Sequence, residues 1–307
     1  MKNKKDFKLD DTWIHAQRDD KNKTDPYRPY ALNIERERTS SGRIEDIATI
    51  FLTNKECPFT CLMCDLWKNT TNEKVPPGAI PEQISWALER LPSGKHIKLY
   101  NSGNFFDKQA IPFEDYGKIA SLVQDLETVI VESHPRLIND QALYFRDILN
   151  TELEVAIGLE SVHPDILPKL NKRMELGDFR KSVEFLNQNN IRSRAFILLR
   201  PPFLTETEGI QWAKRSIDFA FDCGVECCVV IPTRAGNGAL DLLQNEGQFT
   251  PPGINSLEEV LDYGVGLKSG RVFADLWDIN QFSTCDNCLD SRKARMESIN
   301  LHQQLLP

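Results

Sequence analysis

The stretch EDIATIFLTNKECPFTCLMC, residues 45–64, joins an apolar run to a loop that carries three cysteines. The run, residues 45–54, is rich in β-branched and aromatic residues, which predicts a buried strand. Cys57, Cys61 and Cys64 follow at the spacing C-x3-C-x2-C, in a chain with 8 cysteines among 307 residues. A structural metal site normally has four protein ligands, so a local triplet either uses a distant fourth ligand or leaves one coordination position open. The sequence therefore predicts a metal centre directly after a strand.

The composition is that of a globular protein able to bury a substantial core. Hydrophobic residues make up 40% of the chain and charged residues 27%, and the length suits one large domain with terminal extensions. The 37 basic and 45 acidic residues give a net charge of −8, which disfavours a general affinity for nucleic acid or anionic membranes. Because no secretory signal and no bilayer-spanning apolar run is visible, we expect a cytoplasmic protein without a membrane partner.

Strand-like and helix-like segments alternate after residue 45. Further strands are predicted at 96–102, 128–133, 153–161, 191–199 and 225–232, and helices at 81–91, 113–126, 139–149, 177–190 and about 205–223. Such alternation predicts a parallel α/β sheet with right-handed crossovers, and six units predict a partial (β/α)6 TIM-like barrel. We expect a polar N-terminal arm at 1–43, the core barrel at 44–240 and a C-terminal extension at 241–307. In barrels of this kind the reactive groups follow the C-terminal ends of the strands, as the cysteines do here.

Two simpler interpretations of the triplet remain open from the residues alone. Zinc ligands usually come as pairs separated by a longer insert, and the other C-x2-C of this chain, Cys285 and Cys288, lies more than 200 residues away. The triplet together with one C-terminal cysteine would make a closed, non-catalytic zinc or iron–sulfur site. Three buried cysteines that meet by coincidence are the other alternative.

The motif, placed directly after the first strand of a βα series, resembles the radical S-adenosylmethionine (SAM) superfamily over roughly residues 45–235. The resemblance implies that Cys57, Cys61 and Cys64 bind a [4Fe–4S] cluster whose fourth iron binds SAM. It also implies reductive cleavage of SAM, hydrogen abstraction from a substrate, and an electron donor such as flavodoxin or ferredoxin. Met63 stands where the family more often has an aromatic residue that packs on the adenine, and its polarizable thioether suits the same contact.

Residues at the ends of the second and third predicted strands are further cofactor-binding candidates. Ser102, Gly103 and Asn104 in NSGN occupy the place of a glycine-rich segment whose backbone, in the family, receives the amino group of SAM. Glu132 and His134 lie in VESHP, which is similar to an E-T-R-P segment of the Elongator-type and methylthiotransferase-type branch. An ordinary strand-to-helix turn, and a histidine bonded to backbone, are the alternatives.

The next two predicted strands add three candidates. The family commonly places a polar side chain against the ribose of SAM at the end of the fourth strand, where IGLES puts Glu160 first and Ser161 second. Arg194 lies within an apolar strand, where an unpaired charge would be costly to bury. A SAM carboxylate and a structural ion pair are both suitable partners for it.

The C-terminal segment 283–307 holds Cys285 and Cys288 ahead of a basic stretch. The pair is a candidate for a second metal site, with a labile thiol pair or a capping turn as alternatives. Arg292, Lys293 and Arg295 either contact RNA or form a solvated helix face. The whole sequence resembles the branch that contains the radical SAM subunit of archaeosine synthase, which implies a modified tRNA base or a related small molecule as substrate.

Overall fold

Eight strands form one curved sheet whose order follows the chain, in a computed structural model that describes residues 7–305. The strands are β1 (Ala31–Arg38), β2 (Ile44–Phe51), β3 (His96–Tyr100), β4 (Thr128–Ser133), β5 (Glu152–Glu160), β6 (Arg192–Leu199), β7 (Cys227–Pro232) and β8 (Arg271–Ala274). β1 pairs antiparallel with β2, and every pair from β2 to β8 is parallel. The predicted α/β class and partial TIM-like barrel are confirmed, although the sheet has two strands more than the six predicted.

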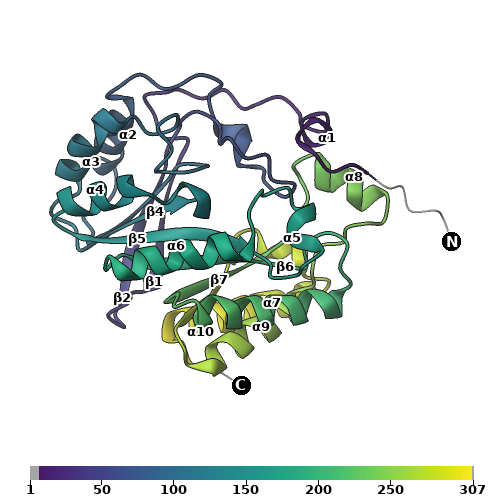
Figure 1. Ribbon diagram of the computed structural model, residues 1–307. Helices are drawn as coiled ribbons and strands as arrows, with labels where there is room; N and C mark the ends of the chain where they lie inside the picture. The colour runs from purple at the N-terminus through teal and green to yellow at the C-terminus, as the bar shows by residue number, and fades with distance from the viewer. Residues whose placement is uncertain (1–6, 306–307) are drawn as a thin grey trace.

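Helices connect the parallel strands as right-handed βα units require. The connecting helices are α2 (Ala79–Leu88), α3 (Tyr116–Leu122), α4 (Asp140–Ile148), α5 (Ile166–Lys169), α6 (Leu176–Gln188), α7 (Glu206–Asp222), α8 (Ala239–Asn245) and α9 (Ile254–Leu267). Helix α1 (Asp11–His15) precedes the sheet, and α10 (Asp286–His302) follows it. Figure 1 shows α2, α3 and α4 grouped at one side of the sheet and α1, α5 and α8 grouped at the opposite side. Within residues 7–305, no helix is long and apolar enough to cross a membrane.

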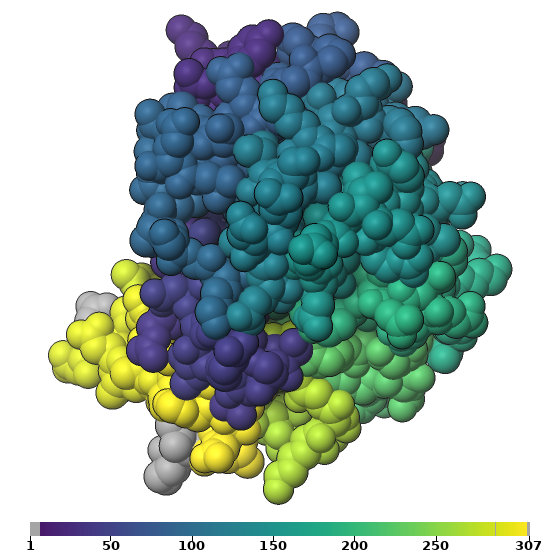
Figure 2. Space-filling view, turned by 90° about the vertical axis from the view of Figure 1, so that its left-hand side faces the viewer, coloured from purple at the N-terminus to yellow at the C-terminus, as the bar shows by residue number. Residues whose placement is uncertain are grey.

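Strand β1 lies in the segment predicted as a polar arm. Its residues are mostly polar and half-buried or exposed, which hides the strand from a search for apolar runs. β1 covers the edge of β2, and α10 packs against it, so that the N-terminal and C-terminal parts of the chain meet there. In Figure 2 the yellow C-terminal segment lies beside the dark purple β1–β2 hairpin. The three-part domain division stays a prediction, and residues 1–6 and 306–307 lie outside the described residues.

The two faces of the sheet have different chemistry because successive side chains point to opposite sides. On β3, Ile97 and Leu99 join the large apolar core between the sheet and its helices, whereas Lys98 pairs with carboxylates of β1. Side chains from the helices complete that core, among them Ile84, Ile119, Phe145, Val183 and Ile217. The inner, concave side of the sheet is therefore where the polar groups gather.

A network of buried ion pairs lies on the concave side of the sheet, near the N-terminal ends of the parallel strands. Arg194 of β6 is 2% exposed. Its Nη2 lies 2.6 Å from Glu37 of β1, and its Nε lies 2.7 Å from Glu154 of β5. Lys98 lies 2.7 Å from the other oxygen of Glu37, and Arg271 of β8 lies 3.4 Å from Glu154. Although burial alone would raise it, the charges of Arg194 and Lys98 hold the pKa of Glu37 well below its usual range.

This network corrects the assignment of Arg194 to the cofactor. The guanidinium is already paired with two carboxylates, as the structural alternative predicted, and it does not line the cavity described below. The sequence offered no sign of Glu37 as its partner because the two residues are 157 positions apart and Glu37 lies in the presumed arm.

Candidate functional site

A cavity of about 370 Å³ opens at the C-terminal end of the parallel strands. Its volume lies at the lower end of the range of ligand pockets in proteins. It is lined by the cysteine loop, by the turns after β3, β4 and β5, and by the ends of β6, β7 and β8. The polar lining residues include Cys57, Cys61, Cys64, Asp65, Ser102, Asn104, Glu132, Ser133, His134, Glu160, Lys172, Thr233, Arg234 and Asp275.

The three cysteines of the motif share this cavity as the sequence predicted. Burial raises the pKa of all three thiols, and raises that of Cys61 to about 12, so thiolates there need a cation beside them. Their Sγ atoms are not all within 4.8 Å of one another. A single tetrahedral zinc holds its sulfur ligands about 3.8 Å apart. The wider spacing suits a cluster in which each thiolate binds a different iron.

Side chains from distant parts of the chain fix the backbone of the cysteine loop. The amide of Asn171 donates to the carbonyl of Thr60 at 2.7 Å, and the backbone N–H of Leu62 donates to Leu170 at 2.9 Å. Asn237 donates to the carbonyls of Leu62 and Cys64 at 2.8 and 3.3 Å. The loop therefore owes its shape to the segments after β5 and β7, and Asn237 is a positioning residue for it.

The N-terminal segment covers the outer side of the same loop. Ile14 of α1 packs with Leu62 and with Leu240 of α8, which agrees with the proximity of α1 and α8 in Figure 1. Arg18 lies 2.6 Å from Glu56, the residue before the first cysteine, and 4.7 Å from the ring centre of Trp67. These contacts keep the segment over the loop and shield the three sulfurs from one side.

The turn after β3 is organised by a buried carboxylate. Glu132 Oε1 accepts hydrogen bonds from the backbone N–H of Asn101 at 2.7 Å and of Gly103 at 3.4 Å. Ser102 has a φ of 52°, in the left-handed region, and its hydroxyl donates to Tyr30 at 2.9 Å. Burial raises the pKa of Glu132 to about 7, against the opposing effect of the backbone donors. Glu132 thus holds the predicted cofactor-binding turn in shape and also faces the cavity.

Asn104 connects this turn to the first cysteine. Its Nδ2 donates to the sulfur of Cys57 at 3.1 Å, while its Oδ1 accepts from the backbone N–H of His134 at 2.5 Å. The ring of His134 stacks on Phe59 at 3.8 Å, and its Nδ1 accepts from the backbone of Arg136. Nε2 therefore carries the proton and donates to the carbonyl of Lys172 at 2.9 Å. Burial, with Lys172 nearby, lowers the pKa of His134 to about 3, so the ring is neutral at pH 7, and the backbone N–H of His134 orients Asn104.

Glu160, the first ribose candidate, is held by an ion pair that the sequence did not reveal. Lys172 lies 2.6 Å from Glu160 Oε1, and both side chains are buried. The pair passes over Gly158, where a Cβ would lie 2.2 Å from Glu160 Oε1 and 2.3 Å from Lys172 Nζ, so the space requires glycine. Ser161 is not part of the cavity lining, because its hydroxyl is turned to the backbone N–H of His163 at 3.2 Å.

The opposite wall is mostly apolar and ends in one ion pair. Phe196, Leu198 and Ile231 line it. Arg234, after β7, lies 2.7 Å from Asp275, after β8. Burial raises the pKa of Asp275, and Arg234 opposes that effect. The sequence missed Asp275 because β8 has only four residues, RVFA, and gives no periodic signal.

The charges that line the cavity favour a cationic ligand. Four carboxyl groups face two basic side chains, so the lining has an excess of negative charge even with Glu132 about half ionised at its pKa of about 7. Glu160 and Asp275 have ion-pair partners, and in the described part of the chain Asp65 and Glu132 have none. A ligand with sulfonium and ammonium groups, such as SAM, complements these two carboxylates. Of the predicted cofactor-binding residues, Met63, Ser102, Gly103, Asn104, Glu132 and Glu160 meet in this cavity with the cysteines, while Ser161 and Arg194 do not.

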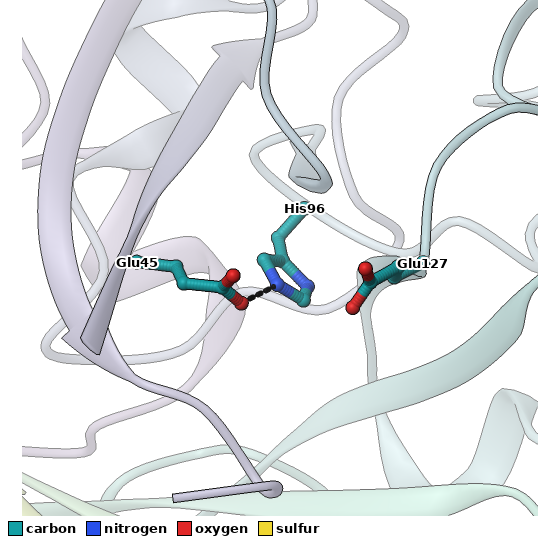
Figure 3. A group of neighbouring side chains, drawn as sticks. All are labelled: Glu45, His96 and Glu127. Atoms are coloured by element: carbon teal, nitrogen blue, oxygen red, sulfur yellow. Dashed lines mark hydrogen bonds and ion pairs between the residues drawn. The ribbon is translucent and has the colours of Figure 1, made fainter. Parts of the chain in front are cut away.

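One other group of metal-ligand types lies at the opposite end of the strands. Among the residues whose side chains the structure describes, only Glu45, His96 and Glu127 bring three ligand atoms within 4.8 Å of one another. Figure 3 shows the ring of His96 between the two carboxylates, with a hydrogen bond of 2.7 Å to Glu45. Arg43 and Lys95 lie 2.6 and 2.8 Å from Glu127 and neutralise the group. It therefore forms an ion-pair cluster, with its negative charge already compensated.

The C-terminal basic stretch does not form a positive patch. Arg292 is paired with Glu258 and Arg295 with Asp262, both acids of the neighbouring helix α9, and Lys293 lies 3.9 Å from Glu297. The solvated-face alternative explains these charges better than contact with RNA does.

The chain is similar to archaeal proteins over about two thirds of its length. It is 27% identical over 229 residues to an uncharacterized protein of Methanocaldococcus jannaschii, covering 69% of this chain and 63% of that protein. It is 26% identical over 210 residues to archaeosine synthase subunit beta of Thermococcus kodakarensis, covering 66% and 65%. The chain therefore spans less than two thirds of the curated relatives it matches. No family model matches it.

A solved structure agrees with this relationship. Elp3 of Methanocaldococcus infernus superposes on 72% of this chain and 58% of its own, with a TM-score of 0.53 at 14% identity. Together with the relatives above, this similarity in fold confirms the resemblance to the radical SAM superfamily that the cysteine motif predicted.

Proposed function

We propose that this chain is a radical SAM enzyme with a [4Fe–4S] cluster on Cys57, Cys61 and Cys64. The observation that carries the proposal is one cavity lined by all three cysteines of the motif, with at least one pair of their sulfurs more than 4.8 Å apart. Among the described residues that line the cavity there is no fourth cysteine. Three thiolates leave one iron of a four-iron cluster for a small ligand.

The residues around the sulfurs support SAM as that ligand. When bound, the cluster and SAM supply one-electron chemistry that cleaves SAM and abstracts a hydrogen atom from a substrate. Glu132 and Asp65 would attract the positive groups of SAM, and the turn at Gly103 lets a ligand approach its backbone. Glu160, fixed by Lys172, presents a carboxylate that suits ribose hydroxyls, and Met63 offers a soft surface for the adenine.

Anaerobic reconstitution with iron and sulfide tests this proposal. We expect about four irons per chain and, with SAM and dithionite, the formation of 5′-deoxyadenosine. Cys61→Ser should lose both, and Cys223→Ser, which changes a buried cysteine outside the cavity, should lose neither. Full iron incorporation without any 5′-deoxyadenosine would favour the alternative, a non-catalytic iron–sulfur or zinc protein.

For the substrate, we propose a modified tRNA base. The names of two relatives, archaeosine synthase subunit beta, support this class. The net charge of −8 and the neutralised C-terminal stretch support the alternative, a related small molecule. Nucleoside mass spectrometry of tRNA from a deletion strain should show a missing modification if tRNA is the substrate. A tRNA enzyme should also bind tRNA with an affinity that falls as salt rises, whereas a small-molecule enzyme should not bind it.

An electron donor completes the proposed function. The cluster needs one electron at a time from a soluble carrier, and flavodoxin and ferredoxin are the classes we expect. Replacement of dithionite by either reduced carrier should sustain formation of 5′-deoxyadenosine.

A further inference from the structure

The cysteines outside the cavity differ in their access to solvent. Cys223, Cys227 and Cys228 are buried at the end of α7 and in β7. Cys285 is half-buried and Cys288 is exposed, at the start of α10. The C-terminal pair is therefore the part of the cysteine content that reagents in solution reach first and that the proposed cluster does not use.

The two C-terminal sulfurs lie in contact. Cys285 is the N-cap of α10, with extended backbone, and Cys288 lies in the first helical turn. This arrangement brings Cys285 Sγ to 3.0 Å from Cys288 Sγ. A disulfide bond is about 2.05 Å long, so the sulfurs need to approach by only about 1 Å to form one. The turn that carries them is at the surface, where such a shift requires no change in the sheet.

The position at a helix N-terminus favours thiol chemistry. The dipole of the 17-residue helix α10 favours a negative charge at its first turn. The shared proton between the two thiols raises the pKa of Cys288, and the charge of Arg292, one turn further along the helix, opposes that effect. Cys288 is thus the more exposed sulfur of the pair, and the charge of Arg292 lies near both sulfurs.

A metal site on the same pair has no support in the described side chains. Among the side chains that the structure describes, only the ion-pair cluster of Glu45, His96 and Glu127 gathers three ligand atoms within 4.8 Å, and Cys285 and Cys288 have no third ligand among them. Two thiolates alone do not complete a structural zinc site.

We propose that Cys285 and Cys288 are a thiol–disulfide exchange site that closes reversibly on reaction with a low-molecular-weight disulfide. The Cys288 thiolate attacks one sulfur of that disulfide, which releases one thiolate and forms a mixed disulfide. The Cys285 thiolate then attacks the Cys288 sulfur and releases the second thiolate. In sum, two protein thiols are oxidised to one disulfide, the small disulfide is reduced to two thiols, and no further oxidant is needed.

The exchange site lies at the end of the segment that forms one cavity wall. Asp275 lines the cavity, and Phe282, in the short helix η4 (Ile279–Phe282) just before the pair, lies 5.9 Å from the guanidinium carbon of Arg234. The pair therefore follows Phe282, a residue that lies near the Arg234–Asp275 ion pair, by three positions in the sequence. The proposal does not depend on the function proposed above, because neither sulfur belongs to the cysteine triplet.

Differential alkylation with peptide mass spectrometry tests this site directly. Trypsin releases residues 272–292 as one peptide that contains Cys285 and Cys288 and no other cysteine, so the cluster ligands do not contribute. The full-length, reconstituted protein is equilibrated without oxygen in equal amounts of reduced and oxidised glutathione. We expect most of this peptide to be lighter than the dithiol form by the mass of two hydrogen atoms and to resist alkylation. Treatment with dithiothreitol should restore both thiols.

Two single variants test the order of attack. In Cys285→Ser, the exposed Cys288 should accumulate a mixed disulfide with glutathione, because no second thiol resolves it. In Cys288→Ser, the half-buried Cys285 should react at least severalfold more slowly. The matched control Cys223→Ser should behave like the unchanged protein at residues 272–292.

Three results would overturn the proposal. The first is two alkylated thiols in the unchanged protein after equilibration. The second is a mixed disulfide with glutathione as its only product. The third is one zinc per chain in the purified protein that is lost in Cys285→Ser, since that would make the pair a metal ligand.

Discussion

The concave side of the sheet carries acidic residues at both of its ends, which are the lower end, where the parallel strands begin, and the upper end, where they finish. The acidic residues differ in whether the protein supplies their ion-pair partners. At the lower end, the carboxylates of Glu37 and Glu154 are paired with Lys98, Arg194 and Arg271 in a network of buried ion pairs. At the upper end, the three thiols and the carboxylate of Glu132 line a cavity, and within the described part of the chain Glu132 has no ion-pair partner.

The pKa values of two glutamates, Glu37 and Glu132, show this difference between the two ends. The pKa of Glu37 is far below its usual range because Arg194 and Lys98 stabilise the charged form, whereas burial raises the pKa of Glu132 to about 7. A buried charge with its partners in the protein is structural, and one that lacks a partner indicates a ligand that brings the opposite charge.

The largest effect is expected from substitution of the cysteines at the upper end, and it is a loss of bound iron. Changing any one of the cluster ligands Cys57, Cys61 and Cys64 to serine should reduce the iron of reconstituted protein at least about tenfold, because the cluster loses one of three protein ligands. Iron analysis and the visible absorbance of the cluster measure this. Cys288→Ser is the matched control and should retain the iron, and a loss of iron there would mean that the cluster uses a C-terminal cysteine.

The second prediction concerns the removal of a buried ion-pair partner at the lower end. Arg194→Met should reduce the free energy of unfolding by about 3–5 kcal/mol, because Glu37 and Glu154 lose a buried partner. Urea denaturation of the cofactor-free protein measures it. Arg28→Met, which removes the partner of the exposed Glu82, should cost less than about 1 kcal/mol. Equal effects of the two substitutions would contradict a structural role for the buried network.

The third prediction uses pH to separate the two glutamates. Since the folded pKa of Glu132 is raised from 4.5 to about 7, the cofactor-free protein should lose stability as pH rises through that window, by about 3 kcal/mol. Because the folded pKa of Glu37 is lowered, its contribution is present above pH 4.5 and is lost as pH falls below it.

The substitution Glu132→Gln tests the first of these two effects, the loss of stability as pH rises from 4.5 to about 7. The substitution should remove the loss of stability between pH 4.5 and 7. It should leave the loss of stability at acid pH unchanged, as measured by urea denaturation at each pH. It should also weaken SAM binding, because one of the two unpaired carboxylates is gone. An unchanged pH profile would show that Glu132 is not the group that titrates.

The smallest effect is expected from a hydrogen bond to sulfur. Asn104→Ala removes the N–H that donates to Cys57 at 3.1 Å, so the reduction potential of the cluster should fall and iron release to a chelator should be about tenfold faster. Potentiometric titration and chelation kinetics measure these changes. Asn101→Ala, in the same turn but without a contact to cysteine, is the control and should change neither.

The sequence predicted the cavity from local motifs but not the contacts that hold it. The triplet, the turn at Gly103 and the strand ends at Glu132 and Glu160 are found by position, because parallel strands bring their C-terminal ends together. Lys172 lies in the loop NKRM, which looks solvated, and only the fold carries it onto Glu160. Asp275 follows a four-residue strand, too short for any periodic pattern.

The errors share a cause with these omissions. Arg194 looked like a ligand-binding residue because its partner Glu37 is 157 residues distant and lies on β1, whose polar sequence resembles an arm. Pairing between segments far apart in the chain is invisible in a single sequence, and it decides whether a buried charge is structural or functional.

The most direct test of the central claim is the electron paramagnetic resonance spectrum of the reduced, reconstituted protein with and without SAM. If one iron has no protein ligand, SAM should shift the spectrum, and the shift should persist in Cys288→Ser. A spectrum that is identical with and without SAM, in protein that holds its full iron, would contradict the claim that the cavity leaves a coordination position for this cofactor.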